Sequence, residues 1–297
     1  MEYELTNTIE IFGFLNIYKP KGMTSHDVIS RLRKITKIKQ IGHTGTLDPF
    51  AEGVLPVCIG KSTRLIEYLE EDKEYLATIQ FGQETDTYDL EGTILKTYDK
   101  KISKTDLKNS LRSFEGEIEQ VPPIYSAIKV DGKKLYEYAR KGLEVEIKPR
   151  RVFISRIELI DFDENAQNAK VLIACSKGTY IRSIAYDLGR TLECGAYLTG
   201  LVRTQSGQFN LKNSVALDEL HDVSDIISNI INPLDVMTLP KYIMNEQEKE
   251  RVIHGMSLTN KSNINSDIVF LVYSGKIYAI GMVDTNRILV KKVFEVL

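Results

Sequence analysis

Residues 41–60 read IGHTGTLDPFAEGVLPVCIG, and this stretch decides how the chain is interpreted. Four glycines and two prolines interrupt it, so one plain helix or strand through the whole stretch is not expected. A single carboxylate, Asp48, lies between Leu47 and Pro49 in otherwise apolar surroundings. The stretch therefore predicts a loop that carries one acid at its centre.

The apolar side chains near Asp48 predict a partly dry wall, made of Leu47, Phe50, Val54 and Leu55. A charge buried in such a wall is costly unless it is paired, so we expect a cationic partner elsewhere in the chain. Arg182, in KGTYIRS, suits this position by residue type. Two plainer interpretations stay open, because an Asp beside proline is often a turn residue and an Arg often forms a surface ion pair.

Outward from this loop, strands and helices mix without a steady βαβ alternation, which favours an α+β fold with a mixed, largely antiparallel sheet flanked by helices. A strand is expected at 12–20 and a helix capped by Thr24 or Ser25 follows it. Residues 74–82 and 92–98 are predicted to pair as strands, and Thr179 is expected to open a helix. Further helices are predicted at 62–70, 103–114 and 246–254, and further strands at 151–162, 169–176 and 196–209.

Residues 1–235 are predicted to form one domain, with an inserted basic finger at about 121–152 that holds a helix at 133–141. Two prolines and a loss of periodicity at 231–242 indicate a linker. Residues 236–297 then form a small β-rich domain, with three strands separated by turn residues.

Composition narrows the class of protein. The 297 residues are 42% hydrophobic and 27% charged, as in an ordinary globular protein, and no apolar run is long enough to cross a membrane. Three scattered cysteines encode neither a disulfide framework nor a zinc site, and the N-terminus lacks the pattern of a signal peptide, so a cytoplasmic protein is expected. The net charge is −2, yet residues 19–39 and 126–156 are locally basic, which fits an acidic partner such as nucleic acid.

Several common motifs are incomplete. IGKST at 59–63 resembles the end of a phosphate-binding loop, but that motif needs glycine where Leu55 stands. The four histidines show no metal-binding spacing, and no G-x-S-x-G sequence indicates a serine nucleophile. No metal or cofactor is therefore predicted.

The loop GHTGTLDPFAEGVLPVCIG resembles the signature of the TruB family, the bacterial tRNA pseudouridine-55 synthases. NIYKPKGMTSHDV at 16–28, DKEYLATIQFGQETDTYDLEG at 72–92, CSKGTYIRSIAYDLG at 175–189 and GAYLTGLVRTQSGQF at 195–209 are similar to its other conserved segments. The resemblance covers about residues 10–235, and the C-terminal part loosely resembles a PUA domain. One departure is Val202, where family members often carry a second arginine that contacts RNA.

The resemblance implies a pseudouridine-synthase fold and an isomerase that converts a uridine in the T-loop of tRNA to pseudouridine after flipping it out of the loop, without a cofactor. It implies that Asp48 is the catalytic carboxylate, that Tyr75 is the base for the C5 proton and that Arg182 pairs with Asp48. Whether Asp48 attacks the substrate or removes a sugar proton stays open. The remaining substrate contacts implied are His43 at the disrupted T-loop, Lys19 beside the site, and Tyr180 and Leu201 around the base.

The basic finger is then expected to close over the T-stem, and a monomer without an obligate protein partner is expected. Two alternatives stay open. One is an RNA-binding scaffold without activity, against which an intact set of Asp48, Tyr75 and Arg182 argues. The other is a synthase that depends on a guide RNA within a larger particle, against which the short chain without long basic tails argues.

Overall fold

A computed structural model describes residues 10–294 of the chain. Its central element is a ten-stranded sheet in the order β14-β1-β3-β12-β4-β11-β10-β7, with β2 beside β3 and β13 beside β12. In this sheet only the pairs β1–β14 and β3–β12 are parallel within the described part of the chain, so the predicted mixed, largely antiparallel sheet is confirmed. The strands are β1 (Gly13–Lys19), β2 (Ile41–His43), β3 (Glu52–Ile59), β4 (Lys73–Phe81), β7 (Gly116–Gln120), β10 (Arg150–Asp163), β11 (Asn168–Cys175), β12 (Ala196–Ser206), β13 (Phe209–Asn210) and β14 (Val215–Ala216).

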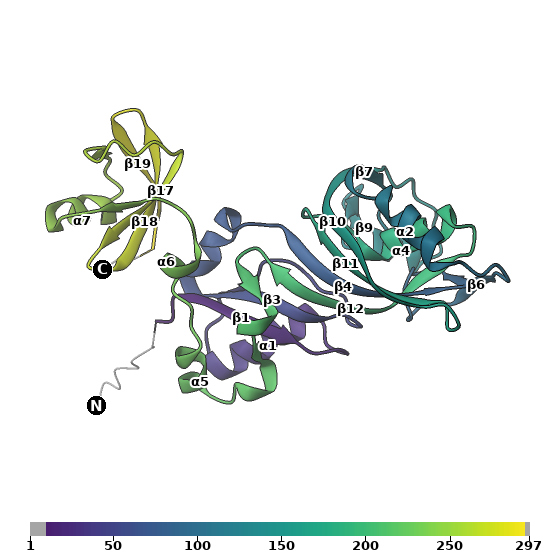
Figure 1. The fold of residues 1–297 in the computed structure, drawn as a ribbon. Coiled ribbons are helices and arrows are strands. Elements are labelled where there is room, and N and C mark those ends of the chain that lie inside the picture. Colours follow the sequence, from purple (N-terminus) through teal and green to yellow (C-terminus); the bar gives the residue numbers. More distant parts are fainter. Residues whose placement is uncertain (1–9, 295–297) are drawn as a thin grey trace.

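Helices flank this sheet at two places (Figure 1). Helix α1 (Ser25–Thr36) begins after Thr24, whose side chain accepts a hydrogen bond from the backbone of Asp27 in a capping box, and α2 (Lys104–Arg112) begins in the same way after Ser103. Helix α4 (Ile181–Thr191) differs from the prediction: Tyr180 precedes it without a side-chain cap, and the Thr179 hydroxyl instead donates to the carbonyl of Ser176 at 2.9 Å. The shorter helices are α3 (Leu135–Ala139), α5 (Val223–Ser228), α6 (Pro233–Val236) and the 3₁₀ helices η1 (Gly60–Tyr68), η2 (Leu211–Asn213) and η3 (Leu217–Glu219).

The stretch at residues 41–60 contains a strand near each end, β2 and β3, whereas its middle is a loop. Strand β3 is almost continuously apolar since both of its faces are covered: Leu55 and Val57 pack with the helix-side core, and Val54 and Cys58 pack with the opposite cluster. On the edge of β3 away from β1, β12 pairs at 52–53 and β2 pairs at 57–59. Pro56 lies between these two pairings, where its missing N–H costs no ladder hydrogen bond.

Two small hairpins project from the main sheet. Strand β5 (Gln83–Thr85) pairs with β6 (Ile94–Thr97), whereas β4 pairs with β11 and β12, so the predicted pairing of 74–82 with 92–98 is wrong. Gly82 follows β4 with a positive φ of 101°, and the chain turns there before β5 begins. The second hairpin, β8 (Lys129–Val130) with β9 (Lys133–Lys134), carries α3 and lies inside the predicted finger.

A second, curled sheet follows in the order β15-β17-β18-β19-β16 and lies at the end of the molecule away from α2 and α4 (Figure 1). Its apolar residues Phe270, Ile280 and Phe294 pack in one cluster with Phe14 and Leu65 of the first part of the chain. Within residues 10–294, no helix is both long and apolar enough to cross a membrane. The elements of this part are β15 (Lys241–Ile243), α7 (Glu246–Ile253), β16 (Leu258–Thr259), β17 (Ile268–Tyr273), β18 (Lys276–Asp284) and β19 (Arg287–Val293).

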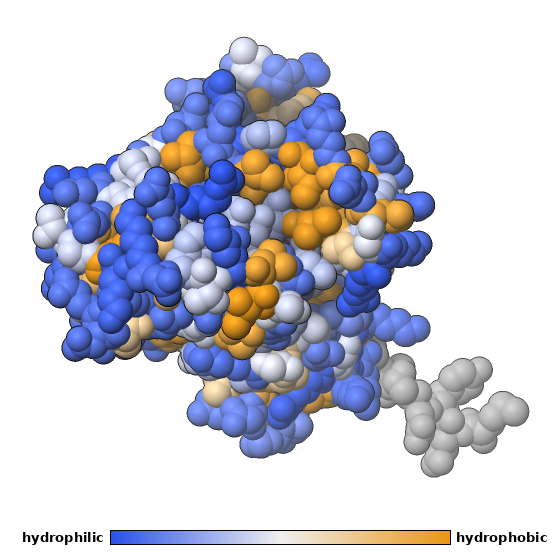
Figure 2. All heavy atoms as spheres, turned by 90° about the vertical axis from the view of Figure 1, so that its right-hand side faces the viewer, coloured by the Kyte–Doolittle hydropathy of each residue, from blue (hydrophilic) through white to orange (hydrophobic). Residues whose placement is uncertain are grey.

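The outer surface at the α2 and α4 end is mostly hydrophilic, with apolar side chains gathered in a few separate patches (Figure 2). Exposed apolar side chains in this part of the chain include Leu90, Leu95 and Phe153. Single apolar residues at a surface are ordinary in globular proteins, so they need no special explanation.

Candidate active site

A cavity of about 520 Å³ opens where the loop after β2, the strand β4, the finger and the N-terminus of α4 meet. This volume lies within the range of about 300–1,000 Å³ that is usual for small-molecule and cofactor sites. The cavity lies within the first part of the chain, and its lining combines apolar, hydroxyl and charged side chains. Four of the predicted site residues besides Asp48 line it, namely Tyr75, Tyr180, Arg182 and Leu201.

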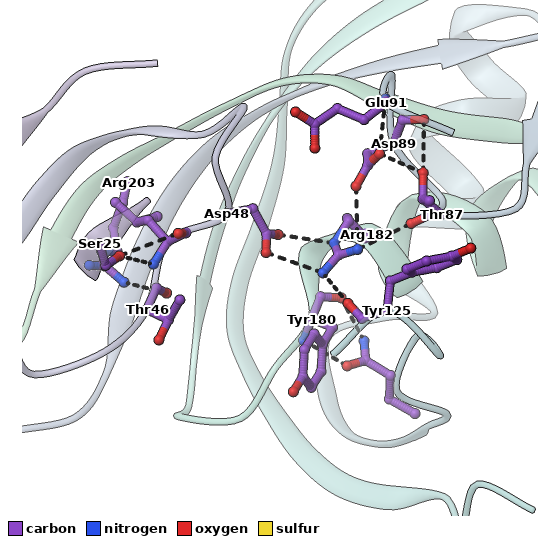
Figure 3. Close-up of polar contacts among 12 residues, drawn as sticks. Ser25, Thr46, Asp48, Thr87, Asp89, Glu91, Tyr125, Tyr180, Arg182 and Arg203 are labelled. Carbon is purple, nitrogen blue, oxygen red and sulfur yellow. Dashed lines mark hydrogen bonds and ion pairs between the residues drawn. The ribbon is translucent and has the colours of Figure 1, made fainter. Parts of the chain in front are cut away.

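The loop that carries Asp48 is held through its backbone by a buried arginine. Arg203, on β12, is fully buried, and its Nε donates to the carbonyl of Val54 at 2.6 Å, in the gap between β12 and β2 on the edge of β3 away from β1. Its Nη2 donates to the carbonyl of Gly45 at 3.1 Å. The Ser25 hydroxyl accepts from the backbone N–H of Leu47 at 2.9 Å (Figure 3). The backbone on either side of Asp48 is therefore fixed by segments that are distant in sequence.

Asp48 forms a two-point ion pair with Arg182, as predicted from the sequence (Figure 3). Nε of Arg182 lies 3.0 Å from Oδ2 of Asp48, and Nη2 lies 3.2 Å from Oδ1. The other contacts of the guanidinium are Nη1 to Oδ2 of Asp89 and to the carbonyl of Thr87, both at 3.3 Å, and Nη2 to the carbonyl of Tyr125 at 3.0 Å. Three of these contacts are hydrogen bonds, from Nη1 to Thr87 and from Nη2 to Asp48 and Tyr125, and the other two are ion-pair contacts.

Asp89 is a site residue that the sequence does not single out. Its side chain is only 4% exposed, and its Oδ1 accepts from the Thr87 hydroxyl at 2.6 Å and from the backbone N–H of Glu91 at 3.0 Å. The loop that carries it follows β5 and is anchored by Tyr88, whose ring stacks on that of Tyr186 with centroids 4.0 Å apart. The signal that points to Asp89 is the acid-rich TDTYDLEG at 85–92, whose carboxylates are too many to choose between without the fold.

Burial and a second carboxylate shape the electrostatics of Asp48. Loss of solvent raises the pKa of Asp48 above its ordinary value, and the nearby Asp89 raises it further, while Arg182 acts in the opposite direction. One third of the Asp48 side chain, 34%, remains exposed toward the cavity. The carboxylate is thus positioned on one side by Arg182 and remains accessible on the other.

Tyr75, on β4, lines the same cavity and is 7% exposed. Burial raises the pKa of its phenol, and the positive charge of Arg203 opposes that rise. The phenol is therefore protonated at neutral pH, and Arg203 favours its ionised form. Tyr180 and Leu201 also line the cavity, so these three predicted site residues lie in the same cavity as Asp48.

The structure does not place Lys19 as the resemblance implies. Lys19 is fully buried, and its ammonium donates to the carbonyls of Pro20 at 2.9 Å, Met23 at 2.7 Å and Pro49 at 3.5 Å. These three acceptors use the three donors of the ammonium, so the expected substrate contact of Lys19 is corrected to support of the Asp48 loop. Burial also lowers the pKa of Lys19 to about 8. His43 lies on β2, half-buried and adjacent to the cavity rather than in its lining.

Comparison with solved structures identifies the fold. The crystal structure of a Cbf5-Nop10-Gar1 complex matches with a TM-score of 0.70 and 25% sequence identity, covering 96% of this chain and 85% of that chain. The archaeal box H/ACA sRNP Nop10-Cbf5 complex matches with a TM-score of 0.68 at the same identity, covering 96% and 86%. The predicted pseudouridine-synthase fold, with its separate curled sheet, is thereby confirmed, and the chain is an isomerase of this class.

The particular family follows from sequence comparison. The model described as TruB family pseudouridylate synthase (N terminal domain) matches residues 33–181, and the tRNA pseudouridylate synthase B C-terminal domain matches residues 182–238. tRNA pseudouridine synthase B of Clostridium kluyveri is 42% identical over 278 residues, covering 91% of this chain and 95% of the relative. The enzyme of the same name from Caldanaerobacter subterraneus is 41% identical over 290 residues, covering 96% and 100%. The chain belongs to the TruB family.

The two family models meet at the start of α4, which does not coincide with a structural boundary. Strand β12, in the second model, lies between β3 and β4, which belong to the first. Arg182 and Arg203 belong to the second matched segment, and they contact Asp48 and its loop in the first. Both matched segments therefore contribute residues to the candidate active site, and both contribute strands to the same sheet.

Proposed function

We propose that this protein converts uridine 55 in the T-loop of tRNA to pseudouridine. The observation that carries the proposal is the Asp48 carboxylate, held at two points by Arg182 and open to a cavity that Tyr75, Tyr180 and Leu201 line. The names of the relatives support tRNA as the substrate class. In the reaction the bond from N1 to the ribose breaks, the base turns and C5 bonds to the ribose, so atoms are conserved and no electrons are transferred.

The target base must leave the T-loop before Asp48 can reach it, at a cost of a few kcal/mol in lost stacking. Leu201 and Tyr180 provide an apolar and aromatic wall for the flipped base. Asp48 acts as the nucleophile or as the base toward a sugar proton, and either role needs its ionised form, which Arg182 favours. Tyr75 takes part in removal of the C5 proton, with Arg203 favouring the phenolate that this step needs.

The finger supplies the contacts to the T-stem in this proposal. Lys133 is exposed, and Lys134 lies with its ammonium 5.4 Å from the ring centre of Tyr136, a residue of α3 that also lines the cavity. The finger thus carries an exposed cation and also an aromatic residue that lines the cavity, which suits a segment that binds phosphates while it covers the cavity. His43, beside the cavity, is proposed to stack in the gap that the flipped base leaves.

We further propose that residues 1–235 form the catalytic domain, that 236–297 form a PUA-like domain, and that the protein works in the cytoplasm as a monomer. The solved neighbours come from complexes with other proteins, but they are only 25% identical to this chain. The relatives named tRNA pseudouridine synthase B are 41–48% identical over most of its length. This difference favours a stand-alone tRNA enzyme over a guide-RNA-dependent subunit.

The test is incubation with an unmodified tRNA transcript without added cofactor, followed by carbodiimide labelling and primer extension. One new stop at the T-loop uridine is expected, and Asp48→Asn should abolish it because the amide keeps the shape but cannot ionise. No stop with the wild-type protein, although the transcript binds, would refute the proposed activity. A stop that survives Asp48→Asn would refute the role of the carboxylate.

A further inference from the structure

Ser126 lines the cavity from the base of the finger, directly after Tyr125. The residue is only 6% exposed, and its hydroxyl is buried without a hydrogen-bond partner within the described part of the chain. The Ser126 hydroxyl lies near the Tyr180 phenol, but the two hydroxyls do not reach ordinary hydrogen-bond geometry. Burial raises the pKa of the Tyr180 phenol, and the Ser126 hydroxyl opposes that rise. The cavity thus contains an unsatisfied hydroxyl next to the predicted binding wall of the base.

The backbone around Ser126 is fixed. The carbonyl of Tyr125 accepts from Nη2 of Arg182 at 3.0 Å, the same nitrogen that lies 3.2 Å from Oδ1 of Asp48. The carbonyl of Ser126 accepts from the backbone N–H of Tyr136 at 3.2 Å, and its own N–H donates to the carbonyl of Ile124 at 3.0 Å. With the backbone fixed, only a change of χ1 among its three staggered positions can redirect the hydroxyl.

An unsatisfied buried hydroxyl is unfavourable for the free protein, because its desolvation is not compensated. An alanine at this position would avoid that cost, so the hydroxyl does not stabilise the fold that the structure describes. A hydroxyl can both donate and accept, and the polar edge of a uracil ring presents carbonyl acceptors and an N–H donor. A ligand with such an edge would satisfy the hydroxyl when it enters the cavity.

We propose that the Ser126 hydroxyl is a substrate-binding group that forms a hydrogen bond with the polar edge of the flipped pyrimidine base. The proposal rests on the function proposed above and adds a contact from the finger to the reacting nucleotide. Because Arg182 holds Tyr125 beside it, this contact places the base relative to Asp48. Ser126 is thus a specificity-determining residue that the finger carries into the site.

The test compares Ser126→Ala with Ser110→Ala. Ser110, on α2, also has a buried hydroxyl without a partner among residues 10–294, but it lines a different cavity, away from Asp48. Activity is measured as kcat/KM on tRNA transcript, and folding as the midpoint of thermal unfolding. Ser126→Ala should lower kcat/KM by about 10- to 100-fold, since it leaves a polar group of the bound base unpaired. Its unfolding midpoint should equal or exceed that of the wild type.

Ser110→Ala should leave kcat/KM within about twofold of the wild type, which separates a ligand contact from the general removal of a buried hydroxyl. Two results would overturn the inference: unchanged kcat/KM in Ser126→Ala, or a loss of activity together with a lower unfolding midpoint. If the alanine variant does not fold, Ser126→Cys keeps nearly the same volume with a weaker hydrogen-bonding group and should show a smaller loss of activity. Wild-type protein without activity would instead contradict the proposed function itself.

Discussion

Replacement of Arg182 by lysine keeps the charge of the site but removes the geometry that the guanidinium provides. The guanidinium of Arg182 contacts two carboxylates and two backbone carbonyls, and its side chain is only 6% exposed. A lysine ammonium has three donors on one atom and cannot reach Asp48 and Asp89 with two-point geometry at the same time. Arg182→Lys therefore tests whether pairing geometry, rather than charge alone, positions Asp48.

The size of the effect follows from the hydrogen bond and the second ion-pair contact that join Arg182 to Asp48, two charged bonds for this purpose. A hydrogen bond to a charged group contributes about 1.5–3 kcal/mol. If lysine keeps one of these bonds and loses the other together with part of the alignment, the activation barrier rises by about 2–4 kcal/mol. At about 1.36 kcal/mol for each factor of ten, kcat should fall by about 30- to 1,000-fold.

The assay is single-turnover conversion of tRNA transcript with enzyme in excess, so that chemistry is separated from product release. Arg190→Lys is the matched control, because Arg190 lies on the same helix and is exposed. It should remain within about twofold of the wild type. An Arg182→Lys variant that folds normally and retains at least half of the wild-type rate would refute the idea that the two-point pairing positions Asp48.

Two further predictions concern the charges around the site. In Asp89→Asn the negative charge that raises the pKa of Asp48 is removed, so Asp48 should ionise at lower pH. The ionised form of Asp48 is the active form, so the acid limb of kcat/KM against pH should move to lower pH. A move to higher pH would contradict the assignment of this limb to Asp48. In the finger, Lys133→Glu with Lys134→Glu should weaken tRNA binding and lower the salt slope by about 2, as measured by filter binding at several salt concentrations. The same charge change at Lys104 and Lys108, exposed on α2, is the control, and an equal slope in the two double variants would contradict phosphate binding by the finger.

The ion pair of Asp48 with Arg182 is predictable from the sequence because it depends only on residue type and on expected burial. An acid in an apolar loop needs a cation, and Arg182, at the start of a helix, meets that need by residue type. The fold class follows in the same way from periodicity, since strands and helices mix without βαβ alternation. The cap of the first helix is predictable because a capping box is local, and the structure shows Thr24, one of the two predicted residues, in that position.

Interactions that depend on the backbone of distant segments are not predictable in this way. The family resemblance implies that Lys19 contacts the substrate, but in the structure Lys19 donates to three backbone carbonyls. Every residue has a backbone carbonyl, so the sequence does not indicate which carbonyls will accept. Asp89 does not stand out because the choice among the acids at 85–92 depends on how the chain turns after β5. Gly53, with a φ of 105°, lies against the backbone of Arg203, a contact that only the pairing of β3 with β12 defines.

Charge balance gives the buried cations a function beyond holding the loop. Lys19, Arg182 and Arg203 carry three positive charges, whereas Asp48 and Asp89 carry two negative charges, so this group has a surplus of one positive charge. Within residues 10–294, Arg203 donates to backbone carbonyls of the Asp48 loop and β3 and forms no ion pair with a carboxylate of its own. Lys19 lowers the pKa of Asp48 and Arg203 lowers the pKa of Tyr75, so each cation opposes the larger rise that burial causes. Lys19 and Arg203, the two cations that fix the loop through its backbone, therefore also favour the protonation states that the proposed isomerisation needs.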